Sequence, residues 1–465
     1  MTPAARRANR EIDAVIAALR QRFGDRLTTA SSVLEQHGRD EGHHATIPPD
    51  AVVYAESTDD VVAAVALCRD HKVPLIPYGT GSSLEGHVAA LEGGICLDLS
   101  RMNRVVRVAP EDLDCTVEAG VTRKQLNDHL RDTGLFFPID PGADASLGGM
   151  AATRASGTNA VRYGTMRDNV LALEVVTADG RVVRTARRAR KSSAGYDLTR
   201  LFVGSEGTLG VITQVTLRLY GIPEAILAAV CPFPSVSAAV DTVVATIQSG
   251  VPIGRVELVD PFAMRAVNAY GKLDYPVAPT LFFEFHGSQG GVDEQVAIVK
   301  ELAAGNGGVD FRWATSQEER GKLWHARHNA HYALMAMRPG CRAWPTDVCV
   351  PISRLAQCIA ETEADLRASP LQTGIVGHVG DGNFHVDFLI DPEKPEEMAE
   401  ARRLNERMVM RAIAMDGTCT GEHGVGYGKI DFLTAEHGEA VALMRTLKRA
   451  LDPDNILNPG KIVRL

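Results

Sequence analysis

The chain has 465 residues, of which 45% are hydrophobic and 23% are charged, which is ordinary for a globular protein with sizeable buried cores. At about 150 residues per domain, this length predicts two to three domains. The formal net charge of −9 argues against a nucleic-acid-binding surface, which needs clustered cations. Since no run of about 18 apolar residues occurs, we predict no membrane span.

The cysteines and the first residues bear on the cellular compartment. The eight cysteines form no C-x-x-C pair, so zinc-finger and iron–sulfur spacings are absent and reduced thiols are expected. Arg6, Arg7 and Arg10 are followed at once by Glu11 and Asp13 rather than by an apolar stretch. We therefore predict no targeting peptide and a cytoplasmic protein.

Residues 1–45 are predicted to be an appended helical segment. One face of a helix, at the 3.6-residue period, is formed by Ile12, Val15, Ile16, Leu19 and Phe23. This face is suited to packing and carries no catalytic group. His43 and His44 follow in a polar stretch, and we interpret them as an incidental pair rather than as metal ligands.

Three loops rich in small residues come next, at residues 77–86, 138–159 and 202–212. The first loop follows a predicted strand, and its backbone N–H groups are suited to a phosphate. It lacks the spacing and the following helix of a G-x-G-x-x-G dinucleotide motif. A plain turn is the alternative for this loop alone, but three such loops favour one long, phosphate-containing ligand with the shape of a dinucleotide.

The pattern around these loops predicts short strands and helices, then a change of composition at Pro223. Strands are expected at residues 52–54, 73–76, 94–99 and 114–117, a helix over 122–133, and a hairpin of 172–178 with 181–185. Beyond Pro223, helices are expected over residues 236–248, 291–304 and 352–368, and strands at 281–286 and 385–390. This alternation predicts a separate α+β domain.

Two glycine-rich segments carry residues suited to catalysis. Residues 418–429 set Glu422 beside His423, and adjacent side chains of an extended segment point to opposite faces. Residues 377–385 offer His378 and His385, whose seven-residue spacing would separate them on a flat strand. A turn within residues 380–382 would bring the two rings together. The two segments would then form a His/His/Glu site with a second histidine beside it, while a structural role is the alternative for each histidine.

Taken together, these segments resemble FAD-linked D-2-hydroxy-acid dehydrogenases of the vanillyl-alcohol-oxidase (PCMH-type) superfamily, closest to the D-lactate dehydrogenase (cytochrome) type. The matching stretches are residues 77–86, 141–164, 202–212, 346–351, 377–385, 417–429 and 451–461. The resemblance implies an α+β fold, in which a PCMH-type FAD-binding domain is joined to an α+β substrate (cap) domain with an antiparallel sheet.

The resemblance also implies a division of the chain and a set of FAD contacts. The expected parts are an N-terminal helical segment (1–45), the FAD-binding domain (46–222), the substrate domain (223–415) and a C-terminal segment returning to the flavin (416–465). The residues expected along FAD are Pro77, Gly79, Thr80, Gly81, Ser82, Ser83, Pro141, Gly142, Gly148, Gly149, Gly157, Gly164, Glu206, Gly207, Gly210, Ile212 and Asn458. His87 stands where some members attach flavin covalently, and we expect it to be uninvolved.

By the same resemblance, the His/His/Glu site binds a divalent metal through His378, His385 and Glu422. These ligand types suit Zn, Mn or Fe without choosing among them. The metal would polarise the substrate hydroxyl. His423 would take the hydroxyl proton near neutral pH, while hydride passes to flavin N5.

Substrate recognition is predicted from three further positions. Arg327 resembles the family's arginine for the substrate carboxylate, with a surface arginine as the alternative. Asn383 is predicted to donate its amide to the substrate, or only to stabilise its turn. Pro345 stands nearest the position where related 2-hydroxyglutarate enzymes use a lysine, and Arg342 is a candidate substitute. This departure favours a monocarboxylate such as lactate.

The predicted function is FAD-dependent oxidation of a D-2-hydroxy acid, with D-lactate favoured, and transfer of electrons to an external acceptor such as a cytochrome, a quinone or a transfer flavoprotein. The alternatives are a D-2-hydroxyglutarate dehydrogenase, a glycolate-oxidase-like subunit, and a non-catalytic flavin-binding assembly subunit. The sequence does not determine the oligomeric state, and a homodimer is one candidate. For the location, a peripheral place at a membrane electron-transfer chain is the alternative to a free cytoplasmic protein.

Overall fold

Two units, each built from separate stretches of chain, make up the computed structural model, which describes residues 10–465. The first unit comprises the chain up to residue 156, residues 164–221 and residues 422–465. The second comprises residues 157–163 and 222–421. The segment that carries Glu422 and His423 therefore belongs with the N-terminal part of the chain. Arg6 and Arg7, which entered the prediction on targeting, lie outside the described residues.

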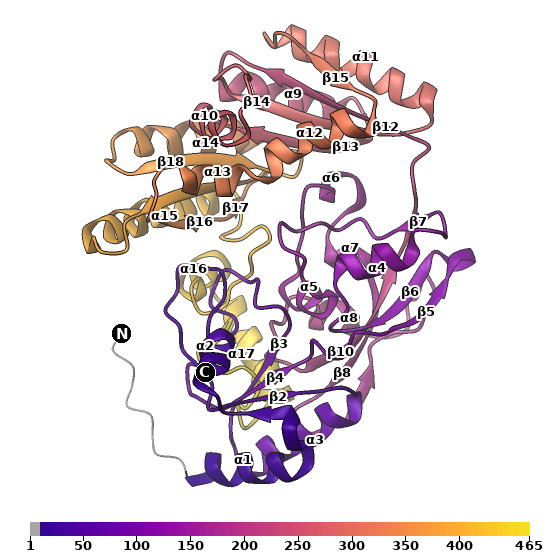
Figure 1. Ribbon diagram of the computed structural model, residues 1–465, viewed down its shortest axis with the longest axis vertical. Coiled ribbons are helices and arrows are strands. Elements are labelled where there is room, and N and C mark those ends of the chain that lie inside the picture. The colour runs from indigo at the N-terminus through magenta and orange to yellow at the C-terminus, as the bar shows by residue number, and fades with distance from the viewer. Residues whose placement is uncertain (1–9) are drawn as a thin grey trace. The chain divides into compact units, whose positions relative to one another are not determined.

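A four-stranded sheet forms the centre of the first unit (Figure 1). Its strands follow the order β1 (Leu27–Thr28), β2 (Ala51–Tyr54), β4 (Ile95–Asp98) and β3 (Leu75–Tyr78). Strands β2, β4 and β3 are parallel, and β1 is antiparallel to β2. Their residues feed core clusters on both faces, which explains why the strands are continuous apolar runs.

Helix α1 (Arg10–Phe23) packs against this sheet with the face that the sequence predicts. Val15, Leu19 and Phe23 are buried in the core, and the other two apolar residues of that face pack against it. Helix α3 (Thr58–Asp70) shares the same core. The N-terminal helix is thus part of the unit's packing.

A five-stranded antiparallel sheet completes the first unit. Its strands follow the order β5 (Val105–Ala109), β6 (Asp114–Glu118), β10 (Val211–Arg218), β8 (Val170–Val176) and β9 (Val182–Arg184). The hairpin of β8 and β9 confirms the predicted one. The unit's other elements are α2 (Ser31–His37), α4 (Arg123–Leu130), β7 (Leu135–Phe136), α5 (Leu147–Thr153), α7 (Met166–Asn169), α8 (Leu198–Phe202), β11 (Tyr220–Gly221), α16 (Ile430–His437) and α17 (Ala440–Leu451).

The chain returns to the parallel sheet after α17. Leu457 forms a parallel bridge with Leu75 of β3. The Leu75 N–H donates to the Ile456 carbonyl at 2.7 Å, and the Asn458 N–H donates to the Leu75 carbonyl at 2.9 Å. Ile456 and Leu457 are buried in the same core as the sheet. The C-terminal residues are therefore tied to the strand that leads into the glycine-rich loop at 79–86.

An eight-stranded antiparallel sheet organises the second unit. Its main order is β15 (Arg312–Ala314), β12 (Ala225–Pro232), β14 (Thr280–Gly287), β13 (Ile253–Val259), β18 (Gln372–Gly377), β19 (Asn383–Ile390) and β16 (Arg342–Pro345), and β17 (Val348–Cys349) also pairs with β19. The expected α+β fold, with a second domain built on an antiparallel sheet, is confirmed.

Helices cover the second sheet. They are α6 (Ala160–Tyr163), α9 (Val236–Gln248), α10 (Pro261–Gly271), α11 (Gln289–Gly305), α12 (Gln317–His328), α13 (Ala330–Ala336), α14 (Ile352–Arg367) and α15 (Pro395–Ala414). One core joins Phe282, Val376 and Leu389 of the sheet to buried residues of α10, α12 and α13. The sheet face that carries Val376 is therefore the face on which α12 lies.

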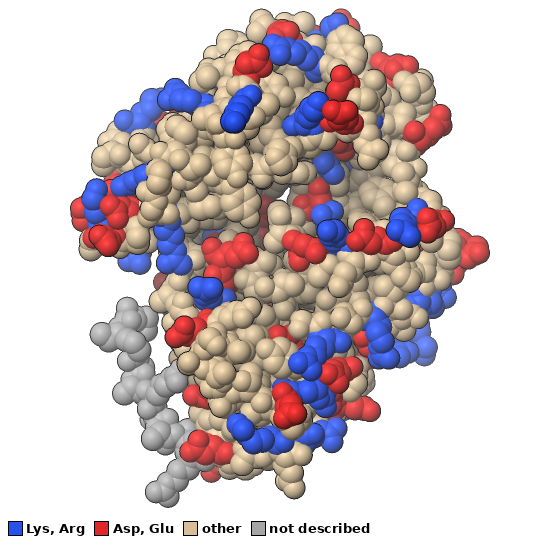
Figure 2. Space-filling model, viewed as in Figure 1, with Lys and Arg blue, Asp and Glu red and all other residues tan. Residues whose placement is uncertain are grey.

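Acidic and basic side chains are interspersed on the face of the molecule that Figure 2 shows. Within residues 10–465, no helix is both long enough and apolar enough to cross a membrane.

Asp260 provides a test of the packing in the second unit. Its side chain caps α10 by accepting from the Ala263 N–H at 2.7 Å, and burial raises its pKa to about 7. The folded protein keeps a proton that the unfolded chain releases near pH ~4, so this group's contribution to stability falls as pH rises from about 4 to about 7. Asp260→Asn keeps a capping oxygen and cannot ionise.

We expect the melting temperature of Asp260→Asn to rise relative to wild type over that pH interval and to level off above about pH 7. Thermal unfolding at several pH values measures this difference. The exposed Asp274 supplies the control variant Asp274→Asn, whose difference from wild type should stay flat. Parallel pH profiles for wild type and Asp260→Asn would contradict the expectation.

Candidate active site

Adjacent strands place the two predicted metal-binding histidines side by side. Val376 of β18 pairs with His385 of β19. Because side chains two residues apart share a face of a strand, His378 lies on the same face as His385. The ring centroids are 5.3 Å apart. The seven-residue spacing would separate the two histidines on one flat strand, but the hairpin brings them to the same face of the sheet.

The turn of this hairpin lies where the sequence predicts it. The Asp381 N–H donates to the His378 carbonyl at 3.0 Å, and the Asn383 N–H donates to the same oxygen at 3.3 Å. Gly382 has a φ of +81°, and a side chain there would overlap the Val350 carbonyl oxygen. Glycine is required at this position, because both the backbone angle and the neighbouring chain exclude a Cβ atom.

Hydrogen bonds fix the orientation of both imidazoles. Nδ1 of His385 donates to the Thr346 carbonyl at 2.8 Å. Nδ1 of His378 donates to the Glu257 carboxylate, 2.8 Å from Oε1 and 2.9 Å from Oε2. A neutral imidazole that donates from Nδ1 carries its lone pair on Nε2. This is the arrangement by which outer partners orient metal-binding histidines.

The two histidines and Glu422 are a set of side chains that could hold a metal ion. One ligand atom from each of His378, His385 and Glu422 lies within 4.8 Å of the others. Glu422 follows directly on Gly421, the last residue of the second unit. Two imidazole nitrogens and one carboxylate oxygen suit Zn, Mn or Fe, and three protein ligands would leave coordination positions for a substrate. The donor set and the ring orientation both fit a divalent ion.

Glu257 connects this group to the predicted substrate arginine. The side chain of Glu257 is fully buried and accepts from Nη2 of Arg327 at 2.7 Å as well as from His378. Burial opposes its ionisation, but His378 and the Arg327 guanidinium, which both donate hydrogen bonds to the carboxylate, hold its pKa below the ordinary value. Glu257 is not among the site residues predicted from the sequence. The available signal is an acidic residue inside the apolar run Val-Glu-Leu-Val of β13.

Arg327 is a buried arginine and not a surface one. It is only 8% exposed, and its Nε makes no hydrogen bond to any residue between 10 and 465. A buried donor without an acceptor costs about 1–3 kcal/mol, and such a position is suited to a ligand oxygen. The surface alternative for Arg327 is therefore wrong, whereas its contact with a substrate carboxylate stays a prediction.

The amide of Asn383 is engaged within the second unit. Its nitrogen donates to Asp347 Oδ1 at 2.7 Å and to the Val348 carbonyl at 2.8 Å. Since an amide nitrogen has two hydrogens, these bonds conflict with the predicted donation to a substrate. The oxygen Oδ1 of Asn383 is buried and accepts no hydrogen bond from the described part of the chain, so it is the atom of this side chain that is left for a ligand donor.

Arg342 lies too far along the sheet to replace the missing lysine. It pairs with Ile390, whereas Pro345 pairs with Asp387. At a rise of about 3.4 Å per residue, Ile390 stands roughly 17 Å along β19 from His385. The candidate substitution by Arg342 is therefore not supported by the register.

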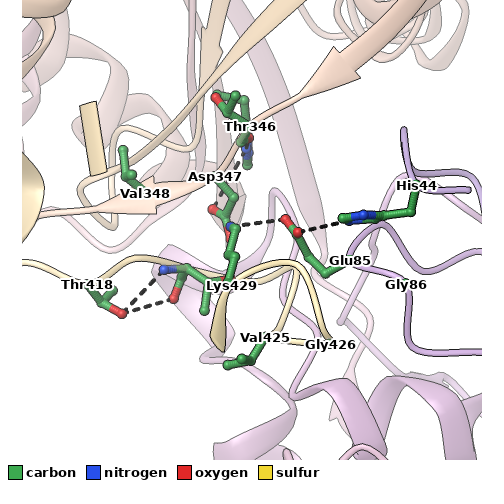
Figure 3. A network of polar contacts seen from close by, with 12 residues as sticks. His44, Glu85, Gly86, Thr346, Asp347, Val348, Thr418, Val425, Gly426 and Lys429 are labelled. Carbon is green, nitrogen blue, oxygen red and sulfur yellow. Dashed lines mark hydrogen bonds and ion pairs between the residues drawn. The ribbon is translucent and has the colours of Figure 1, made fainter. Parts of the chain in front are cut away.

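A buried ion cluster of the first unit lies beside the Glu422–His423 segment. Glu85 lies between His44 and Lys429 (Figure 3), with Nε2 of His44 at 3.5 Å and Nζ of Lys429 at 3.2 Å from its carboxylate oxygens. Burial opposes ionisation of Glu85, but the Lys429 ammonium, together with His44 and His423, lowers its pKa to about 2. The sequence analysis missed this cluster and interpreted His44 as incidental.

The loop after β3 has the features of a phosphate cradle. Within the part of the chain that the structure describes, the backbone N–H groups of Thr80, Gly81 and Ser82 donate to no protein acceptor. The hydroxyls of Thr80 and Ser82 are 3.1 Å apart. Backbone amides and hydroxyls in this arrangement suit a pyrophosphate. The other predicted FAD contacts also belong to the first unit, with the exception of Gly157, which belongs to the second.

Two family profiles match the chain. Residues 49–186 match the FAD binding domain, and residues 222–462 match the C-terminal domain of FAD linked oxidases. The chain belongs to the FAD-linked oxidase family.

Named relatives cover almost all of the chain. A probable mitochondrial D-lactate dehydrogenase from Danio rerio is 56% identical over 459 residues, which are 98% of this chain and 92% of that protein. A mitochondrial D-lactate dehydrogenase [cytochrome] from Arabidopsis thaliana is 49% identical, over 97% of this chain and 80% of that protein. Glycolate oxidase subunit GlcD from Bacillus subtilis is 33% identical over 89% of both.

A solved structure matches the fold. A crystal structure of p-cresol methylhydroxylase with substrate bound superposes with a TM-score of 0.82 at 21% identity, over 98% of this chain and 97% of that one. At this identity the likeness supports the PCMH-type fold and nothing finer.

The predicted cytoplasmic location is wrong. The relatives from Danio rerio and Arabidopsis thaliana, and two more from Kluyveromyces lactis and Saccharomyces cerevisiae, are named as mitochondrial proteins. The prediction relied on the absence of an apolar stretch. Such a stretch is the mark of a secretory signal. Mitochondrial leaders are instead amphipathic and rich in arginine, so this criterion could not exclude a mitochondrial protein.

Glu257→Gln tests whether the carboxylate orients the metal site. The amide keeps the shape of the side chain but accepts more weakly from His378, so we expect divalent-metal affinity to fall by about 10- to 100-fold. Titration of chelator-stripped, FAD-loaded protein with Zn²⁺ and with Mn²⁺, against a chromophoric chelator, measures it. The matched control is Glu284→Gln, another buried glutamate, which pairs with His286 instead. Equal affinity in Glu257→Gln and wild type would remove Glu257 from this role.

Proposed function

We propose that this protein oxidises a D-2-hydroxy acid, with D-lactate as the favoured substrate, to the corresponding 2-oxo acid and passes the electrons to an external acceptor. The observation that carries the proposal is the 56% identity to a probable D-lactate dehydrogenase over 98% of this chain. A cytochrome is the favoured acceptor, because a second relative is named a D-lactate dehydrogenase [cytochrome]. The relatives' names also favour a mitochondrial place for the reaction.

The residues around the hairpin bind and orient the acid in this proposal. Arg327 binds the carboxylate, with its buried Nε as an available donor and Glu257 holding its Nη2. Oδ1 of Asn383, rather than its nitrogen, accepts from the substrate hydroxyl or a bound water. His378, His385 and Glu422 hold the divalent ion. A bound divalent ion supplies Lewis acidity, which makes the substrate hydroxyl easier to deprotonate.

His423 is the general base of the proposed reaction. It adjoins Glu422 in the chain, and an imidazole is suited to accept a proton near neutral pH. The hydroxyl proton moves to His423 as the C2–H bond breaks. Bound FAD supplies the acceptor, at N5, for the hydride that leaves C2 with its electron pair. The substrate thus loses one proton and one hydride and becomes the 2-oxo acid.

The predicted FAD contacts and domain boundaries complete the proposal. The residues at 77–83 bind the pyrophosphate, and the donors are the backbone N–H groups of Thr80, Gly81 and Ser82, for which the described residues offer no acceptor. The FAD-binding domain spans 46–222, the substrate domain spans 223–415, and the segment from 416 to the end returns to the flavin. Support for the last point is the pairing of Leu457 with Leu75.

A glycolate-oxidase-like function is the second candidate. It is favoured by the 33% identity to a glycolate oxidase subunit, and it would also use a monocarboxylic 2-hydroxy acid. A D-2-hydroxyglutarate dehydrogenase is less well supported, because Arg342 lies far along the sheet from His385. A non-catalytic flavin-binding subunit is the remaining alternative.

The substrate is tested by anaerobic bleaching of the flavin absorbance. We expect D-lactate to bleach the FAD-loaded protein, L-lactate to leave it oxidised, and glycolate or D-2-hydroxyglutarate to act more slowly. Stopped-flow absorbance with each acid measures the rates. If none of the D-2-hydroxy acids bleaches the flavin, the proposed function is wrong. Turnover of the isolated chain with an artificial dye would argue against a purely structural subunit.

His423→Ala tests the general base. Loss of a positioned base lowers the rate of flavin reduction by about 10²- to 10⁴-fold, while the FAD and metal contents should stay at wild-type levels because neither depends on this ring. The matched control is His437→Ala, an exposed histidine at the end of α16. Flavin reduction at the normal rate in His423→Ala would exclude the residue as the base.

A further inference from the structure

Glu206 holds the backbone just after the Glu422–His423 pair. Its Oε1 accepts from the Val425 N–H at 2.7 Å, and its Oε2 accepts from the Gly426 N–H at 2.8 Å. Glu206 is 5% exposed, and all of these residues belong to the first unit. Two consecutive main-chain donors on one carboxylate form a charge-assisted pair of bonds. They fix the direction of the chain at that point.

The segment fits closely against Glu206 and its neighbour His87. Nε2 of His87 is 3.3 Å from Oε2 of Glu206. Gly424 has a φ of +83°, and a Cβ atom there would stand 2.8 Å from Oε1 of Glu206 and 2.7 Å from Nε2 of His87. Only glycine therefore lets the chain lie against this pair. The requirement gives Gly424 a role that the glycine-rich pattern alone could not reveal.

Glu206, which holds the Val425 and Gly426 amides, is itself linked by hydrogen bonds to the parallel sheet. Nδ2 of Asn458 donates to the Glu206 carbonyl at 2.8 Å and to the His87 carbonyl at 3.1 Å. The Asn458 N–H in turn donates to the Leu75 carbonyl of β3. The Glu206 N–H donates to the Ala152 carbonyl at 2.9 Å. The carboxylate thus projects from a backbone that is held on both sides.

We propose that Glu206 is a positioning residue that sets the place of His423 and Glu422 by clamping the Val425 and Gly426 amides. The inference rests on the proposed function, in which those two side chains supply the base and a metal ligand. The segment from 421 to 428 contains four glycines, and such a chain has much conformational freedom to lose. A displacement of about 1 Å at a reacting group can cost about 100-fold in rate. The carboxylate removes that freedom two residues beyond His423.

A role as an FAD contact alone is the competing explanation for Glu206. A mere contact predicts that substitution weakens FAD binding while the remaining loaded protein keeps its full rate. A clamp predicts that FAD stays bound while the backbone at 422–428 loosens and catalysis falls. The two outcomes differ in a measurement that requires no substrate.

The test compares Glu206→Gln with wild type in FAD-loaded, full-length protein. The amide of the variant accepts from one N–H and presents its own NH₂ group to the other. We expect hydrogen exchange in peptides covering 422–428 to become about tenfold faster, and flavin reduction to slow by up to about 100-fold. FAD content and exchange elsewhere should stay at wild-type values. The control is Glu118→Gln, a buried glutamate of the first unit that pairs with Arg104.

Gly424→Ala perturbs the same contact from the other side, because its methyl group would press on the Glu206 carboxylate while Glu206 itself is not substituted. We expect a similar increase in exchange at 422–428, and less than additive effects in the double variant, because both changes release one clamp. Unchanged exchange in both variants would overturn the proposal, as would lost FAD with full activity of the loaded fraction in Glu206→Gln. Faster exchange in both variants would support the clamp even if wild type failed to oxidise any D-2-hydroxy acid, an outcome that would reject only the proposed function.

Discussion

The candidate site depends on the hydrogen bonds that the buried carboxylate of Glu257 accepts from His378 and Arg327. This carboxylate lies within a sheet, with no contact to solvent, and it is held by His378 on one side and Arg327 on the other. A buried charge is stable only when it is paired, and removal of one partner of such a pair costs about 3–5 kcal/mol. The same bonds that make Glu257 tolerable also orient the imidazole and hold the guanidinium. Stability and site geometry therefore have one cause here.

In the first unit, buried carboxylates likewise hold functional residues in place, but the segment that they hold is a loop. Glu85 pairs with Lys429 and His44, and Glu206 binds the amides of Val425 and Gly426. The segment between 421 and 429 has too many glycines to hold one conformation by itself. Because loops carry functional residues but lack a ladder of main-chain bonds, two buried carboxylates supply the fixed points that a strand would otherwise provide. Figure 3 shows the first of them between His44 and Lys429.

Much of the fold follows from local patterns. The apolar face of α1, the hairpin of β8 with β9, and helix α9 occur where periodicity and turn chemistry predict them. The geometry of the two histidines is also predicted from the glycines of their turn, and the resemblance to FAD-linked oxidases follows from motifs in order. These features are predictable because each depends on residues close together in the chain.

Other features depend on partners far apart in the chain, and for that reason they were missed or mistaken. Glu257 lies 121 positions from His378, and its own strand shows an acidic residue in an apolar run without identifying the partner. The surroundings of Asn383 and Arg342 could not be predicted, because strand register, which local pattern does not determine, decides what each side chain meets. The prediction of a cytoplasmic location was wrong because it used the apolar stretch of a secretory signal as its criterion, which does not apply to mitochondrial proteins.

By itself, the sequence determined the class of protein, the order of its elements, and the residue types available for a metal, a proton and a carboxylate. Tertiary structure alone decided which of these groups meet and what holds them. The antiparallel register brought Glu257 beside His378, and the packing of α12 on the sheet brought Arg327 to it. The return of the chain placed Asn458 against Glu206 and His87. The physical reason is that a side chain's chemistry is local, whereas its burial, its partners and its orientation are set by packing across the whole unit.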